Sequence, residues 1–282
     1  MKRPLRFLLY FLLLITGPVI SQAQDQLTGT GAVSIGVGSA FQGVQGNFWS
    51  LYHNPAGIAT LSQATVGIGL ERRFLLSEMN AASVGVAFPF GTSQGIGIQA
   101  SSLGFSAYRE SQAGLTYGIH LWDLISIGVA ADFFMLSIQD FGQQQALLLT
   151  TGVQARLSST FSLGVTAFNV GQPEITTDIG TTELPSGISA GITYTPTEEL
   201  WLNVDVQKSP GFEASYRGGL QYALHKHFQA RLGVSTAPLA WSGGFGVLWQ
   251  GLNMDMAVRF TEFLGYTPHF SLSYAFGKSR DE

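Results

Sequence analysis

From residue 64 onward, apolar and polar residues alternate along the chain with a period of two. The clearest example begins at Leu252, where Leu252, Met254, Met256, Val258 and Phe260 form one set and Asn253, Asp255, Ala257 and Arg259 form the other. Successive side chains of a β-strand point to opposite faces of the sheet. The pattern therefore predicts strands with one apolar and one polar face.

Fourteen such segments follow one another, separated by short stretches of turn residues. The predicted strands are 64–72, 80–89, 93–105, 110–121, 124–138, 146–157, 160–171, 185–196, 199–208, 213–225, 227–237, 241–250, 252–262 and 268–276. A soluble sandwich would alternate as well, but it would place charges on the outward face. Here that face is apolar, with aromatic residues near the strand ends, as in membrane barrels. These residues are Trp201, Tyr216, Tyr222, Trp241, Trp249, Tyr266, Tyr274 and Phe276.

The composition favours the membrane alternative. Charged residues make up 11% of the chain and hydrophobic ones 45%, whereas soluble domains carry about 25% charged residues. After the N-terminal region, no uninterrupted apolar stretch approaches the length of a membrane helix. We therefore predict an all-β fold, a 14-stranded antiparallel transmembrane β-barrel covering 64–276. The net charge of −4 argues against nucleic acid as a partner.

The first residues have the zones of a secretory signal. Lys2, Arg3 and Arg6 precede an apolar run, and Ser21-Gln22-Ala23 fits a cleavage site. We expect 1–23 to be a signal peptide. Because the chain has no cysteine, a lipid anchor and disulfides are excluded. Links between strands alternate between tight and longer, as periplasmic turns and extracellular loops do, so both termini, including a tail at 277–282, are expected in the periplasm.

Residues 24–63 do not alternate and are rich in glycine. They contain large apolar residues that need burial, including Phe41, Phe48 and Trp49. A barrel of fourteen strands is wider than its own side chains can fill. We therefore expect this segment to be a plug, or hatch, inside the lumen. Phe41, Phe48 and Trp49 are expected in its core first, and are candidate ligand contacts second.

The stretch 31–61 ends in Asn54, Pro55, Ala56 and Gly57, just before the first predicted strand. This arrangement resembles the start of FadL-like barrels and of their PorV/PorQ relatives in the type IX secretion system. The resemblance implies an outer-membrane protein of a Gram-negative bacterium, in the Bacteroidota, that binds secretion-system proteins. The FadL-like alternative implies an importer of hydrophobic small molecules. Gly46 and Asn47 stand where the family commonly has acidic residues, and short loops weaken a cargo-binding role.

Signs of catalysis are weak. Two G-x-S-x-G matches, at 91–95 and 187–191, lie in a predicted turn and a predicted strand, without the helix that this nucleophile motif needs. His225 and His227 flank Lys226 in a turn, and two imidazoles without a carboxylate make a poor metal site. We expect neither an enzyme, nor a cofactor, nor a metal.

Seven charged residues fall in mid-strand on the polar face: Asp132, Asp205, Asp255, Arg156, Arg217, Arg231 and Arg259. Charges are costly on a lipid face, so all seven are expected in the lumen. They either select solutes or hold the plug against the wall, and the mixture of signs favours the second role. Arg217 and Arg231 lie on adjacent strands, so a partner between them is expected, either plug carbonyls or Asp205.

Overall fold

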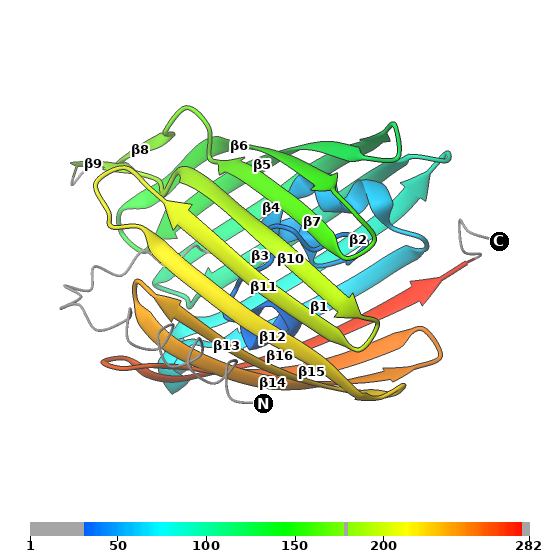
Figure 1. The fold of residues 1–282 in the computed structure, drawn as a ribbon. Helices are drawn as coiled ribbons and strands as arrows, with labels where there is room; N and C mark the ends of the chain where they lie inside the picture. The colour runs from blue at the N-terminus through cyan, green and yellow to red at the C-terminus, as the bar shows by residue number, and fades with distance from the viewer. Residues whose placement is uncertain (1–30, 178–179, 278–282) are drawn as a thin grey trace.

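The computed structural model describes residues 31–177 and 180–277, without the side chains of 176, 177, 180 and 182. The expected signal peptide at 1–23, the first residues of the expected plug and the tail 278–282 lie outside the described residues. Fourteen antiparallel strands close into one barrel (Figure 1). It closes where β1 pairs with β16, with Ala64 opposite Phe276.

The strands that form the barrel agree closely with the predicted ones. They are β1 (Ala64–Arg72), β2 (Asn80–Phe90), β3 (Gln94–Gly104), β4 (Tyr108–Leu121), β5 (Ile125–Ile138), β6 (Gly142–Arg156), β7 (Phe161–Phe168), β10 (Gly187–Thr197), β11 (Leu200–Lys208), β12 (Ser215–His225), β13 (Phe228–Thr236), β14 (Leu239–Trp249), β15 (Leu252–Thr261) and β16 (Gly265–Phe276). Each pairs with its two neighbours around the ring.

The expected difference in link length is wrong in part. The link between β13 and β14 was expected to be one of the longer ones, yet it holds only Ala237 and Pro238. The longest link, between β7 and β10, carries a second small sheet of β8 (Glu174–Thr177) and β9 (Gly180–Glu183). Two 3-10 helices, η2 (Arg73–Leu75) and η3 (Ser77–Met79), connect β1 to β2.

The outward face of the wall is an apolar surface. Leu115 is 60% exposed, Val204 57% and Leu232 65%, whereas inward-facing neighbours such as Thr116 and Asn203 are buried. This alternation is the one expected when hydrocarbon lies outside the wall and polar groups lie inside it. Within the described residues, no helix is both long and apolar enough to span a bilayer.

Residues 31–63, here called the inner segment, run through the interior of the barrel (Figure 1). They form α2 (Ala32–Gly36), α3 (Ser50–His53) and the 3-10 helix η1 (Pro55–Thr60). Ala32 is hydrogen-bonded to Ser271 on β16 and Phe41 to Asp205 on β11, so the segment contacts well-separated parts of the wall. Its apolar side chains form the main buried cluster: Val33, Val37, Phe41, Val44, Phe48, Trp49, Leu51, Ile58 and Leu61, with Ala87 of the wall.

Glycines on the inner side of the wall make room for this segment. At eleven of them, a methyl group in place of the hydrogen would overlap or press on an atom of the inner segment. They are Gly67, Gly69, Gly85, Gly95, Gly97, Gly118, Gly128, Gly152, Gly164, Gly219 and Gly233. Close approach of a second backbone is a known use of glycine within strands. The 35 glycines of the chain are thus partly explained by the packing of the inner segment.

Candidate functional site

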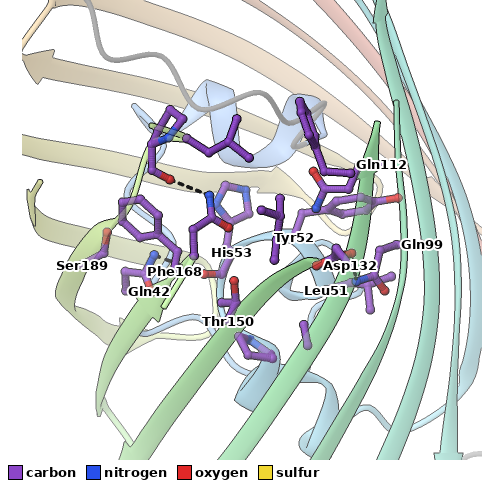
Figure 2. Close-up of a pocket in the computed structure, with 17 residues that line it drawn as sticks. Gln42, Leu51, Tyr52, His53, Gln99, Gln112, Asp132, Thr150, Phe168 and Ser189 are labelled. Atoms are coloured by element: carbon purple, nitrogen blue, oxygen red, sulfur yellow. Dashed lines mark hydrogen bonds between the residues drawn. The ribbon is translucent and has the colours of Figure 1, made fainter. Parts of the chain in front are cut away.

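A cavity of about 90 Å³ lies between the inner segment, the inner faces of β3 to β7 and β10, and the long link (Figure 2). Its apolar lining consists of Leu51, Pro55, Ala130, Phe134, Leu148, Phe168, Leu184 and Pro185. Its polar lining consists of Gln42, Tyr52, His53, Gln99, Gln112, Asp132, Thr150, Asn169 and Ser189. A concave site with apolar walls and a few polar groups is typical of small-molecule binding sites.

The apolar wall of the cavity is fixed by a second hydrophobic cluster. This cluster contains Phe134 on β5 and Leu148 on β6. It also contains two residues that follow β7, Ile175 of β8 and Leu184 of the long link. The amide of Asn169 donates a 2.5 Å hydrogen bond to the carbonyl of Pro185 (Figure 2). This bond joins the two ends of the link that follows β7. The link is thereby held over the inner faces of β5 and β6.

The polar side of the cavity is a hydrogen-bonded network on the wall. Asp132 Oδ1 on β5 accepts a 2.9 Å bond from Gln99 Nε2 on β3. Gln99 Oε1 in turn accepts a 3.1 Å bond from the Thr116 hydroxyl. The Tyr52 hydroxyl of the inner segment donates to the Val84 carbonyl at 2.8 Å. Burial raises the pKa of Tyr52, so this hydroxyl stays a neutral donor over the physiological range.

The predicted motif Asn54 to Gly57 forms the turn that leads into η1. The Asn54 side chain accepts from the Ala56 N–H at 3.1 Å and caps this helix. Its amide donates to the carbonyls of Gln42 at 3.1 Å and Val153 at 3.4 Å. Gly57 packs against Ser50, where a methyl group would lie 2.5 Å from the serine Cβ. The motif therefore joins two parts of the inner segment to the wall, and Pro55 also lines the cavity.

Phe41, Phe48 and Trp49, the three candidate ligand contacts, do not line this cavity. They are 1%, 5% and 2% exposed and belong to the main cluster, where Phe48 and Trp49 pack edge to face with centroids 5.1 Å apart. Their apolar character required burial, and the packed core supplies it. The inner segment instead presents Leu51, Tyr52 and His53 to the cavity. The sequence did not single them out, because they directly follow Phe48 and Trp49 and nothing in the pattern separates core residues from cavity residues there.

The seven predicted lumen charges lie on inward positions of the wall and have different partners. Asp205 accepts from the backbone N–H groups of Phe41 at 2.6 Å and Gln42 at 3.0 Å. Arg156 donates to Gln45 Oε1 at 3.0 Å, and Arg259 donates to the Ser39 hydroxyl. At least three of the seven thus hydrogen-bond directly to the inner segment.

The remaining charges are arranged differently from the expected cluster. Asp205 lies opposite Arg217 in the register of β11 and β12, but it does not separate Arg217 from Arg231. Arg231 lies opposite Gln221 instead, and it pairs with Asp255 of β15 at 2.7 Å. Asp132 is the only one of the seven that lines the cavity.

The weak catalytic signals lie in ordinary elements of the barrel. The stretch 91–95 spans the turn between β2 and β3, and 187–191 lies inside β10, without a following helix in either place. The rings of His225 and His227 are 5.5 Å apart. Among residues 31–177 and 180–277, no group of three His, Cys, Asp or Glu side chains is placed to hold a metal ion.

Comparison with known proteins identifies the fold. No protein-family model matches the chain, and no curated protein matches its sequence. Among solved structures, a "CymD monoaromatic hydrocarbon channel" matches with a TM-score of 0.66 and 14% identity, over 90% of this chain and 99% of that one. The Ralstonia pickettii toluene transporter TbuX matches with a TM-score of 0.67 and 12% identity, over 89% and 100%.

A Pseudomonas aeruginosa FadL homologue is similar as well, with a TM-score of 0.59 and 12% identity, over 91% of this chain and 99% of that one. The likeness spans nearly the full length of both chains in each case. At these identities it establishes a shared barrel fold. The chain is therefore a closed 14-stranded antiparallel barrel that shares its fold with these three outer-membrane proteins.

Proposed function

We propose that the chain is an outer-membrane barrel that admits small hydrophobic molecules, which bind in the cavity between the inner segment and the wall. The observation that carries this proposal is the cavity itself, walled by Phe134, Leu148 and Phe168. Its volume, about 90 Å³, is of the same order as the dry apolar cavity of about 150 Å³ that binds benzene in another protein. The cavity is therefore of the order of size that a single-ring molecule needs, and its apolar wall would pack against the ring.

The outer-membrane location rests on the apolar outward face of the wall. Outward residues such as Leu115 and Leu232 are more than half exposed, and a bilayer is the solvent in which such a surface is stable. In the proposed orientation both termini are periplasmic, so the cavity and the long link lie toward the outside.

The inner segment acts as a plug in this proposal. It fills the lumen with a packed core, so a solute that enters the cavity passes further only when the segment shifts. The seven charged residues serve mainly to hold it: Asp205, Arg156 and Arg259 bond to it directly.

The fold comparisons favour this function over the secretion role. The structural relatives are named as a monoaromatic hydrocarbon channel and a toluene transporter. The secretion-system assignment rests on sequence resemblance alone, and no comparison supports it. Binding and passage need no reaction, so the proposed function includes no enzyme activity, no cofactor and no metal.

The test uses adjacent alanines of β5 that face opposite sides of the wall. Ala130 is 4% exposed and lines the cavity, whereas Ala131 is exposed on the outward face. In a deletion strain complemented with each variant, we expect Ala130→Phe to reduce uptake of radiolabelled toluene at least fivefold and Ala131→Phe to leave it near wild type. Folding of both variants is checked on gels, where a folded barrel migrates differently before and after heating; both variants should show this shift to the same extent as the wild type.

Two outcomes oppose the proposal. If Ala130→Phe takes up toluene as the wild type does, the cavity is not on the path. If the deletion strain keeps normal uptake and loses proteins from its cell surface, the secretion role replaces the importer.

A further inference from the structure

A buried carboxylate lies on the polar side of the cavity, two residues from the apolar wall. Asp132 is 5% exposed and lies two residues before Phe134 on the same inward face of β5. Figure 2 shows its side chain directed toward the cavity beside Leu51 and Gln99. A carboxylate in such surroundings is unfavourable unless it is hydrogen-bonded and its charge is balanced.

The protein supplies hydrogen bonds to Asp132 but no balancing charge. The side-chain amides of Gln99 and Gln112 both bond to it. Within the part of the chain that the structure describes, no lysine, arginine or histidine nitrogen lies within 4.0 Å of its oxygens. A carboxylate has roughly four lone-pair positions. With only two neutral amides bound to it, the Asp132 carboxylate can still accept hydrogen bonds from a ligand, and its negative charge can still be balanced by one.

The two other buried aspartates of the wall bond to protein groups away from the cavity. Asp255 pairs with Arg231 at 2.7 Å. Asp205 accepts two backbone N–H bonds from the inner segment. Neither lines the cavity. Asp132 therefore differs from both in lining the cavity, and it differs from Asp255 also in having no cationic group of the described residues within 4.0 Å.

We propose that the cavity selects small apolar molecules that carry a hydrogen-bond donor at one end, with a protonated amine favoured most, and that it rejects carboxylates. This inference rests on the proposed function and names its substrate class. The apolar end of the ligand packs against Phe134, Leu148 and Phe168 while the donor end reaches Asp132. An ammonium group offers donors and balances the charge, an alcohol offers one donor, and a hydrocarbon offers none. A carboxylate is repelled by Asp132.

The test is a ligand series with one common body. Binding of 4-fluorobenzylamine, 4-fluorobenzyl alcohol, 4-fluorotoluene and 4-fluorobenzoate to the full barrel in detergent is followed by ¹⁹F NMR. The same titrations with the Ala130→Phe barrel, whose cavity is filled, serve as the control for ligand that only partitions into the detergent micelle. We expect the amine to bind at least tenfold more tightly than the toluene, the alcohol to lie between them, and the benzoate to bind most weakly. This ranking uses the wild-type protein and needs no other variant to fold.

A matched pair of substitutions tests the role of Asp132. Asp132→Asn removes the charge at the cavity, and Asp140→Asn makes the same change in the exposed turn between β5 and β6. We expect Asp132→Asn to weaken amine binding about tenfold, to leave toluene binding within twofold, and to strengthen benzoate binding. Asp140→Asn should change none of the three.

The possible failures are distinguishable. If toluene binds the wild type as tightly as the amine, or if Asp132→Asn leaves the ratio of amine to toluene unchanged, the inference is overturned and the importer remains. If none of the four molecules binds the wild type more tightly than Ala130→Phe, both the inference and the proposed binding site fail.

Discussion

Asp205 Oδ2, on wall strand β11, accepts a 2.6 Å hydrogen bond from the backbone N–H of Phe41 in the inner segment. The same oxygen accepts from the next N–H, that of Gln42, at 3.0 Å. Asp205 is 3% exposed, so the bonds form away from water. One buried carboxylate thus fixes the middle of the inner segment to the wall.

Removing this carboxylate should destabilise the barrel. In Asp205→Ala, two buried N–H groups lose their acceptor, and hydrogen bonds to charged groups contribute about 1.5–3 kcal/mol each. We expect a lower midpoint in urea unfolding followed by tryptophan fluorescence, and a smaller loss for Asp205→Asn, which keeps one acceptor. Glu262→Ala, in the exposed turn between β15 and β16, is the control. An unchanged midpoint for Asp205→Ala would show that the inner segment is held elsewhere.

The buried pair of Arg231 and Asp255 should behave as a unit. Both side chains are 2% exposed. Removing one partner of such a pair typically costs about 3–5 kcal/mol, because the other charge is left buried and uncompensated. We expect Asp255→Ala to be strongly destabilising in the same unfolding assay, and Arg231→Met with Asp255→Leu to recover most of the loss. Additive effects of single replacements at the two sites would contradict this coupling.

The glycines of the wall predict a sharp positional effect. A methyl group at Gly128 would overlap the Pro55 carbonyl carbon and the Ala56 nitrogen, whereas at Gly243 the nearest atom, Leu232 Cδ2, is 3.7 Å away. Overpacking of this kind costs about 1–3 kcal/mol. Gly128→Ala should therefore lower the thermal midpoint of the detergent-solubilised barrel, and Gly243→Ala should not. Equal midpoints would mean that the inner segment does not press on β5.

Asn54 should stabilise the inner segment through its helix cap and its hydrogen bonds to Gln42 and Val153. Asn54→Ala removes the acceptor for Ala56 and the donors to Gln42 and Val153, and the loss of a cap alone costs about 0.5–2 kcal/mol. We expect increased proteolysis within 31–63 by an added protease. The exposed Asn80, whose amide bonds only to the nearby Ser77 carbonyl, provides the control Asn80→Ala. Protection equal to wild type in Asn54→Ala would contradict the role of the motif.

The barrel was predictable because its signal is local and repeated. Strand β1 (Ala64–Arg72) was predicted to the residue, since strict alternation begins and ends there. The inward position of Asp132 followed from the same parity. The sheet of β8 and β9 was not predicted, because the link that contains it has no apolar alternation against a neighbouring strand.

The cavity could not be predicted from any single stretch of sequence. Its lining brings together Gln42, Asp132 and Leu184, which are far apart in the chain and meet only when the inner segment and the long link fold into the barrel. The inner segment itself was predicted from its apolar content. Which of its faces packs and which lines the cavity depends on where wall glycines such as Gly97 allow close approach.

The central claim is that odd and even positions of the wall face different surroundings. Because the chain has no cysteine, a single cysteine with a bimane label reports on one position in bilayers that contain brominated lipid. We predict strong quenching for Leu232→Cys, since Leu232 is 65% exposed on the outward face, and little quenching for Thr150→Cys, since Thr150 lines the cavity. Equal quenching at the two positions, or stronger quenching at 150, would contradict the account.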